Sequence, residues 1–181
     1  RGERVLDLAC GTGDIAFAAA AEGARVVGLD LTYRMLQLAA RKSNAAGLVA
    51  ADMTSLPFGS RTFDVVTTGY GLRNVPDLNL AIDEIARVLR PGGRLLSLDF
   101  NRPQPALIRG AYLAYLTAVG ATLGWILHGD PDTYRYIPAS IRRYPGATGV
   151  AALLTAHGFT SVSVVPLLFG LMTLHLAERS R

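Results

Sequence analysis

Three acidic residues each follow a short apolar run that has the character of a buried strand. Asp7 closes the run that starts at Val5, Asp30 closes residues 25–30, and Asp52 comes shortly after residues 48–50. Parallel strands bring their carboxyl ends to the same edge of a sheet, so we expect the three carboxylates to lie together. Three negative charges at one edge favour a ligand with positive charge.

A glycine turn separates the first apolar run from a helix pattern that starts at Asp14. Gly11 and Gly13 let the backbone turn tightly and approach a ligand closely, at a helix N-terminus. Residues 11–16 also fit the relaxed dinucleotide fingerprint G-x-G-x-x-A, but Asp14 would repel a pyrophosphate in the first helical turn. S-adenosylmethionine, which carries an ammonium and a sulfonium, suits the acids better. The alternative is that Asp14 is a helix-start acid and Asp7 a turn acid.

The acids predict distinct contacts with this cofactor. Asp30 lies 17 residues after Gly13, near the spacing at which a carboxylate accepts both ribose hydroxyls. Asp52 can accept from an adenine amino group while Met53 packs on the ring. Cys10 is expected to be a small residue packed beneath the loop. The full predicted set is Asp7, Cys10, Gly11, Thr12, Gly13, Asp30, Leu31, Met35, Asp52, Met53 and Gly69.

Composition narrows the class of protein. With 181 residues, half of them hydrophobic, the chain is expected to form one domain over residues 1–181. A net charge of +4 without a Lys/Arg run does not indicate nucleic acid, and one cysteine excludes an internal disulfide. The three histidines form no zinc motif, so no metal is predicted. Because the sequence starts without Met and enters a core strand at once, we expect a missing N-terminal segment; no signal peptide is visible.

Strand and helix patterns alternate through the first hundred residues. This predicts an α/β fold with a mostly parallel sheet and helices on both faces. A helix is expected to be capped by Thr32, and another to end at the Pro91-Gly92-Gly93 turn. The expected strands are residues 5–8, 25–30, 48–50, 63–69 and 94–100, and the expected helices are residues 14–22, 32–43 and 80–89.

The C-terminal half breaks this alternation. Residues 105–127 form a long apolar run, of which residues 110–127 carry no charge and reach the lower limit for crossing a bilayer. Thr and Gly dilute its hydrophobicity and strands follow, which favours a buried core helix or a helical cover over an apolar substrate. A polar, aromatic segment (130–145) and a helix (149–157) come next. Strands 161–165 and 169–177 lie too close for a helical crossover and should pair antiparallel.

Several segments resemble a known family. Residues 5–100 resemble class I S-adenosylmethionine-dependent methyltransferases, whose Rossmann-like sheet has an antiparallel last strand. Tyr70-Gly71-Leu72-Arg73-Asn74-Val75, residues 89–94 and Asp99-Phe100 are similar to the ubiquinone/menaquinone-biosynthesis C-methyltransferases. Tyr134-Arg135-Tyr136-Ile137 and Ser140-Ile141-Arg142 match that family's substrate-side signature. The resemblance covers nearly the whole chain and implies a helical substrate-side insertion over residues 101–148, after the fifth strand.

The resemblance implies methyl transfer to a ring carbon of a polyprenylated benzoquinol or naphthoquinol. The carbon is a good nucleophile only after a hydroxyl loses its proton. Arg73 could stabilise the quinolate, Asn74 could orient it or a bridging water, and Asp99 could relay a proton or be a structural acid. A surface role for Arg73 and a turn role for Asn74 are the alternatives. Residues expected to line the head-group pocket are Tyr70, Tyr134, Tyr136, Ser140 and Arg142.

A polyprenyl quinol stays in the bilayer, so we expect a cytoplasmic enzyme that meets the inner face of the membrane peripherally. The apolar run and nearby arginines suit this contact; they are Arg102, Arg109, Arg135, Arg142 and Arg143. Homodimerisation is left open. Two other functions stay open: a methyltransferase for another small molecule, and a methyltransferase-like domain that binds cofactor without turnover.

Overall fold

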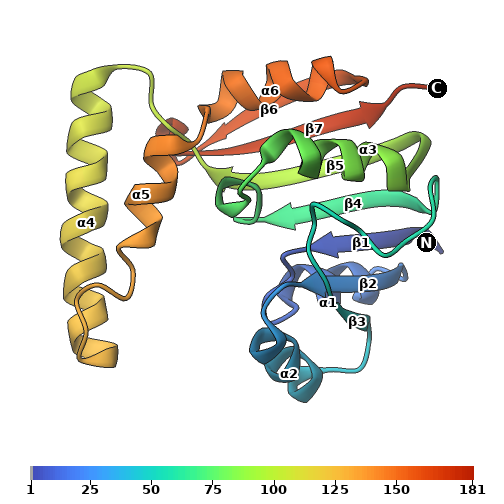
Figure 1. Cartoon of the computed structure of the whole chain (residues 1–181), viewed down its shortest axis with the longest axis horizontal. Coiled ribbons are helices and arrows are strands. Elements are labelled where there is room, and N and C mark those ends of the chain that lie inside the picture. Colours follow the sequence, from blue (N-terminus) through green and yellow to red (C-terminus); the bar gives the residue numbers. More distant parts are fainter. Residues whose placement is uncertain (1) are drawn as a thin grey trace.

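A computed structural model describes residues 2–181 as an α/β fold built on one seven-stranded sheet (Figure 1). The strand order is β3-β2-β1-β4-β5-β7-β6. The strands are β1 (Arg4–Leu8), β2 (Arg25–Asp30), β3 (Gly47–Ala50), β4 (Phe63–Gly69), β5 (Leu89–Phe100), β6 (Phe159–Leu167) and β7 (Met172–Arg179). The α-helices are α1 (Asp14–Ala21), α2 (Tyr33–Lys42), α3 (Leu78–Val88), α4 (Ala106–His128), α5 (Tyr136–Arg143) and α6 (Gly146–Ala156). Two 3₁₀ turns are η1 (Leu72–Asn74) and η2 (Leu168–Gly170).

Strands β1 to β5 are parallel, and the last two are joined by a hairpin. Leu6 on β1 pairs with Val27 on one side and Val66 on the other, in parallel register. Ser97 of β5 faces His175 of β7 in antiparallel register, and β6 pairs antiparallel with β7. The predicted mostly parallel sheet with an antiparallel last strand is therefore confirmed.

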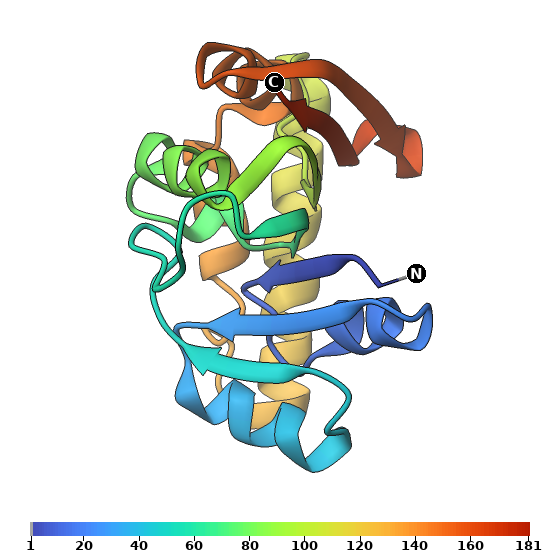
Figure 2. The same cartoon turned by 90° about the vertical axis from the view of Figure 1, so that its right-hand side faces the viewer.

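The two faces of the sheet carry separate apolar clusters because side chains alternate along each strand. On β1, Val5 belongs to a small cluster with Ala16 of α1, whereas Leu6 and Leu8 belong to the large cluster. That large cluster includes Ile82 of α3 and residues of α6. Figure 2 shows α3 and α6 (green and orange) on one side of the sheet and α1 (blue) on the other. The expectation of helices on both faces is confirmed.

The boundary between α3 and β5 differs from the prediction. Helix α3 begins at Leu78, because Asp77 caps it by accepting backbone N–H groups of Asn79 (2.9 Å) and Leu80 (3.2 Å). The helix ends at Val88, so residues 91–93 do not terminate it. They lie inside β5, where the register with β4 shifts in a bulge.

Three other predicted features at the ends of elements differ from the structure. Thr32 precedes α2 as expected, but its side chain makes no capping bond; instead its N–H donates to Asp30. Helix α6 begins three residues earlier than the predicted residue 149. The predicted start of the last strand, Phe169, lies in the 3₁₀ turn with a left-handed backbone (φ 56°).

Helix α4 stands at one end of the molecule, beside α5 and away from the other helices (Figure 1). It packs through Tyr112 and Leu113, which form a small cluster with Ile141 of α5. Its buried residues are these two and Gly124, so the alternative of a buried core helix is wrong. It is long and apolar enough to cross a membrane, with a mean hydropathy of 1.4 over its best window.

Gly13 is required by the turn before α1. Its backbone is left-handed (φ 86°), and a Cβ there would lie 2.5 Å from the ring of Phe17. Glycine avoids both the strain and the clash, and the chain enters α1 directly after β1. The predicted strand, glycine turn and helix are confirmed.

Candidate active site

A cavity of about 480 Å³ opens at the carboxyl ends of the parallel strands. Its size is in the range of small-molecule sites. Predicted cofactor residues that line it are Gly11, Asp30, Leu31, Met35, Asp52, Met53 and Gly69. Tyr70, Asn74 and Tyr136, predicted for catalysis and the substrate, line it too. Seven lining residues were not predicted: Ala9, Leu29, Thr32, Ala51, Gly71, Val75 and Pro76. We call it the first cavity.

Four predicted cofactor residues do not line the first cavity: Asp7, Cys10, Thr12 and Gly13. Cys10 is buried against Gly28, and burial raises the pKa of its thiol to about 12, so it is a packing residue. Thr12 donates to Asp14, whose carboxylate is exposed and paired with Lys42 at 3.0 Å. Asp14 is thus neutralised at the surface, and the charge argument against a pyrophosphate rests on the other acids.

Asp30 organises the loop around the first cavity. Its Oδ2 accepts the Gly11 N–H at 2.8 Å, and its Oδ1 accepts the Thr32 N–H at 2.8 Å. A carboxylate has about four acceptor positions, so Asp30 can still receive ribose hydroxyls. Asp52 similarly accepts from the N–H and hydroxyl of Thr54, which lowers the pKa of its carboxyl.

Asp7 is the least satisfied of the acids. Its side chain is buried; Oδ1 accepts from the Thr67 hydroxyl at 2.7 Å, while Oδ2 has no hydrogen-bond partner within residues 2–181. Burial raises its pKa to about 6, and the charge of Asp30 adds to this. An orphaned carboxylate oxygen close enough to Asp30 for their charges to interact fits a cationic ligand. The residues therefore fit S-adenosylmethionine.

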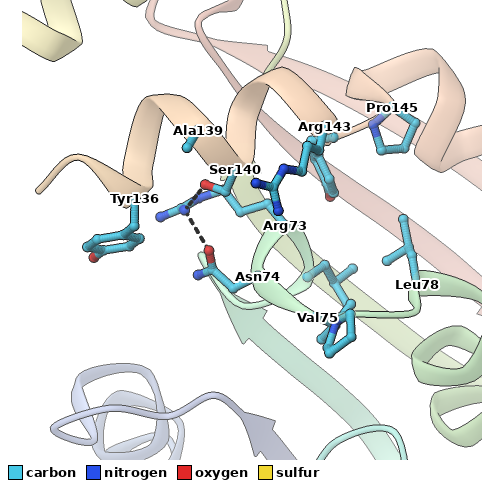
Figure 3. A pocket seen from close by; sticks show the side chains of 12 residues that line it. Arg73, Asn74, Val75, Leu78, Tyr136, Ala139, Ser140, Arg143 and Pro145 are labelled. Carbon is cyan, nitrogen blue, oxygen red and sulfur yellow. Dashed lines mark hydrogen bonds between the residues drawn. The ribbon is translucent and has the colours of Figure 1, made fainter.

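A second cavity, of about 560 Å³, lies between η1 and α5 (Figure 3). It shares Asn74, Val75, Pro76 and Tyr136 with the first cavity, so the two adjoin. Its other lining residues are Leu72, Arg73, Leu78, Ala139, Ser140, Arg143, Tyr144 and Pro145. A molecule in each cavity would meet at this shared wall.

A buried ion pair lies at the second cavity. The Arg73 side chain is 3% exposed, and its Nε lies 2.9 Å from Oδ1 of Asp99. Nη1 donates to Oδ1 of Asn74 (2.9 Å) and to Oγ of Ser140 (2.7 Å), as Figure 3 shows. The backbone N–H groups of Arg73 and Phe100 also donate to Asp99. A surface role for Arg73 is excluded.

Aromatic rings enclose this guanidinium. Its Cζ lies 5.2 Å from the Phe100 ring centre and 5.9 Å from that of Tyr136, within cation–π range. Tyr70 packs on Phe100, and its carbonyl accepts from the Asn74 amide at 3.0 Å. Asn74 thus ties Arg73 to the Tyr70 turn. Burial raises the pKa of Asp99 to about 6, while Arg73 opposes this rise.

Some of the residues predicted to bind the substrate line the second cavity, and others do not. Tyr136 and Ser140 line the second cavity, whereas Arg142 does not; Arg143 does. Tyr134 is also elsewhere, with its hydroxyl 3.1 Å from Nε2 of His128 at the end of α4. Cavity-lining residues 136, 139, 140 and 143 follow helical spacing. That spacing was the signal in the sequence; the expected helical insertion over residues 101–148 contains α5, but no separate helix was delimited there.

The strand order, with an antiparallel last strand, is that of the class I S-adenosylmethionine-dependent methyltransferase fold. Solved structures share the fold: an S-adenosylmethionine-dependent methyltransferase from Aquifex aeolicus has a TM-score of 0.70 at 16% identity, covering 98% of this chain and 82% of that one. Phosphoethanolamine N-methyltransferase 2 of Haemonchus contortus, in complex with S-adenosylmethionine, has a TM-score of 0.72 at 17% identity, covering 99% of this chain and 49% of that one.

The family follows from the sequence matches. Residues 1–179 match the ubiE/COQ5 methyltransferase family, to which this chain belongs. It is 40% identical to demethylmenaquinone methyltransferase of Thermus thermophilus, over 98% of this chain and 83% of that protein. It is also 40% identical to the ubiquinone/menaquinone biosynthesis C-methyltransferase UbiE of Saccharophagus degradans, over 96% of this chain and 74% of that protein. The protein is a methyltransferase that uses S-adenosylmethionine.

The buried ion pair predicts that replacing Asp99 destabilises the protein more than replacing Arg73 does. Asp99→Asn keeps the size of the side chain but has one acceptor oxygen for the two backbone N–H groups that Asp99 binds with separate oxygens. It also leaves a buried guanidinium that cannot lose its proton, so we expect a loss of about 3–5 kcal/mol in unfolding free energy. Arg73→Met should cost less, because Asp99 can take up a proton. The double variant should recover most of the Asp99→Asn loss. Denaturant unfolding at about pH 8, above the Asp99 pKa of about 6, measures all three; additive losses would contradict a coupled pair.

Asp7 predicts a pH dependence of cofactor affinity. Its pKa is about 6 in the folded protein, so the carboxylate prevails above that pH and the neutral acid below it. We expect S-adenosylmethionine affinity to fall by about one to two decades as pH drops through 6, because the negative charge of Asp7 beneath the cavity is lost; a charge–charge interaction at a partly buried site contributes about 2 kcal/mol. Asp7→Asn should bind weakly with a flat profile in calorimetry. The matched control, Asp14→Asn, should behave as wild type; an unchanged profile in Asp7→Asn would contradict the assignment.

Proposed function

We propose that this methyltransferase transfers the methyl group of S-adenosylmethionine to a ring carbon of a polyprenylated quinol, demethylmenaquinol or a related compound. The observation that carries the proposal is the shared wall of the two cavities, with Arg73 beside it. The names of the relatives support the quinol. The first cavity would hold the cofactor and the second the substrate head group.

Catalysis of this methyl transfer requires alignment of the two reactants more than covalent catalysis by the protein. The cofactor would supply an electrophilic methyl group. After a quinol hydroxyl gives its proton to solvent, the C–C bond would form as the S–CH3 bond breaks and S-adenosylhomocysteine leaves. The proton on the methylated ring carbon would then move to the ring oxygen through water, which restores the aromatic quinol. Placing both reactants against Asn74 and Tyr136 would bring them into line, an effect that can be worth about 7–11 kcal/mol of the barrier. The aromatic walls formed by Tyr136 and Tyr144 would also exclude water from the reacting atoms.

Arg73 is positioned to bind the substrate oxygen. Its Nε faces Asp99, and Nη1 is held by Asn74 and Ser140. Nη2 makes no hydrogen bond to the described part of the chain, which leaves a donor for a quinolate. Asp99 is fully buried and bound by two backbone N–H groups. We therefore assign Asp99 the role of holding Arg73, instead of relaying a proton.

The exposed face of α4 suits the membrane surface that a polyprenyl substrate requires. Leu107 (86% exposed), Trp125 (67%) and Leu127 (63%) are large apolar side chains on this helix. At its N-terminal half, Leu107 and Ile108 form an apolar groove with Leu171, next to the fully exposed Phe169 of the β6–β7 hairpin. These exposed apolar side chains suit shallow insertion into lipid.

Two of the five arginines expected to contact anionic lipid are bonded within the chain. Arg109 donates to the carbonyls of Pro103 and Gln104, and Arg135 pairs with Asp132 at 3.4 Å. Both guanidinium groups are thus engaged locally. Arg142 and Arg143 are exposed on α5 and are the better candidates for anionic lipid. The protein would then bind the cytoplasmic face of the membrane peripherally.

The quinol assignment predicts methylated product from demethylmenaquinol, detected by mass spectrometry. Arg73→Met should lose roughly two to three decades in rate, the scale for one preorganised electrostatic contact. Arg73→Lys should lose less, since it keeps the charge without the planar fork. S-adenosylmethionine affinity should stay near wild type in both variants, because Arg73 does not line the first cavity.

The alternatives give different results in the same assay. Cofactor binding without product from any quinol would indicate a domain without turnover, and product only from an unprenylated acceptor would indicate another substrate. An Arg73→Met variant that keeps its rate would remove Arg73 from the reaction.

The α4 surface predicts salt-sensitive binding to anionic vesicles. Trp125→Glu should weaken vesicle binding by about tenfold or more, because burial of a large apolar side chain contributes about 1.5–3 kcal/mol. Leu80→Glu is a matched control, since Leu80 is an exposed apolar residue on α3. Cosedimentation measures both. Protein that resists a high-salt wash and needs detergent for extraction would instead indicate a spanning α4.

A further inference from the structure

Tyr144, the residue directly after α5, lines the second cavity but was not among the predicted site residues. Its side chain is 3% exposed, and its ring belongs to the large apolar cluster between the sheet, α3 and α6. Its N–H donates to the Ser140 carbonyl at 3.0 Å, which closes the last turn of α5. The ring is therefore fixed by packing at one wall of the cavity.

The hydroxyl of Tyr144 has no hydrogen-bond partner within the part of the chain that the structure describes. Buried tyrosine hydroxyls are normally satisfied, because desolvating an unpaired polar group is unfavourable. Tyr112 shows the usual arrangement nearby: it is also buried, and its hydroxyl donates to the Leu171 carbonyl at 3.2 Å. The orphaned hydroxyl is thus a feature of Tyr144, a residue that lines a cavity.

The charges around Tyr144 favour a donor role. Burial and the nearby Asp99 raise the pKa of its hydroxyl far above the usual value, although Arg73 opposes this. The phenol consequently keeps its proton at neutral pH and can donate it in a hydrogen bond. The hydroxyl is covered by protein atoms, so a ligand reaches it after a small displacement of the wall. Arg143, an exposed residue of the same wall, has a long side chain that can move.

We propose that Tyr144 is a substrate-binding residue whose hydroxyl donates a hydrogen bond to a ring oxygen of a hydroxyaromatic substrate in the second cavity. The inference rests on the proposed function, in which Arg73 binds one oxygen of the quinol. A para-quinol has two ring oxygens, and Tyr144 supplies a donor from a different part of the chain. The pair would select a ring that carries oxygen over a bare aromatic ring.

The test compares Tyr144→Phe with a matched variant, Tyr112→Phe. The probe is 1,4-dihydroxynaphthalene, kept reduced, and the protein is saturated with S-adenosylhomocysteine. We expect Tyr144→Phe to bind the probe about tenfold more weakly than wild type, as for the loss of one hydrogen bond. Tyr112→Phe should bind the probe as wild type does. Naphthalene, which lacks hydroxyls, should bind all three proteins equally.

Stability separates this role from a structural one. Tyr144→Phe should unfold at the same or a higher denaturant concentration than wild type, because it removes an unsatisfied hydroxyl, whereas Tyr112→Phe should unfold at a lower one. Equal probe affinity in wild type and Tyr144→Phe would overturn the inference, as would a wild type that does not bind the probe. If binding depends on Tyr144 but demethylmenaquinol is not methylated, the inference stands and the proposed quinol reaction fails.

Discussion

The ion pair between Arg73 and Asp99 is the interaction on which the substrate side depends. It joins the end of β5 to η1, and through Ser140 it joins both to α5, three segments that are far apart in the chain. Two charges that are almost fully removed from water need good geometry and further hydrogen bonds to offset their desolvation. Asn74 and the backbone N–H groups at Asp99 supply them. The result is a cation of fixed direction in the wall of the second cavity, instead of a mobile side chain in solvent.

The sequence predicts well what depends on local pattern. Buried parallel strands appear as apolar runs, and the glycine turn at Gly13 appears because few other residues can adopt its backbone. The antiparallel hairpin follows from the short connection between its strands. The bounds of α5 within the expected helical insertion were not predicted, because Pro138 and a polar composition obscure its period. The places of Arg143 and Tyr144 in the wall of the second cavity were therefore missed as well. Arg73 and Asp99 are 26 positions apart in the chain. Their residue types suggested a role in the site for each one separately, but the sequence does not show that Asp99 holds Arg73.

The acids at the strand ends illustrate the same limit. Their positions predict a common edge, which the structure confirms for Asp30 and Asp52 at the first cavity. The bonds they make are not visible in the sequence, because they depend on backbone directions. Asp30 holds the glycine loop and the start of α2, while Asp7 is left with an unpartnered oxygen beneath them. Two aspartates at similar strand ends thus have different roles: Asp30 fixes the shape of the site, and Asp7 contributes negative charge to it.

The division of the two cavities between segments of the chain has a consequence for how such enzymes diversify. The first cavity is built mainly from loops before residue 77, whereas the second takes half of its wall from α5 and the residues that follow it. Tyr136 is the residue of α5 that reaches both. Substitutions along the rest of α5 can therefore reshape the second cavity while the first cavity is left unchanged. With the acceptor in the second cavity, as proposed, α5 is the segment in which substitutions would change the acceptor.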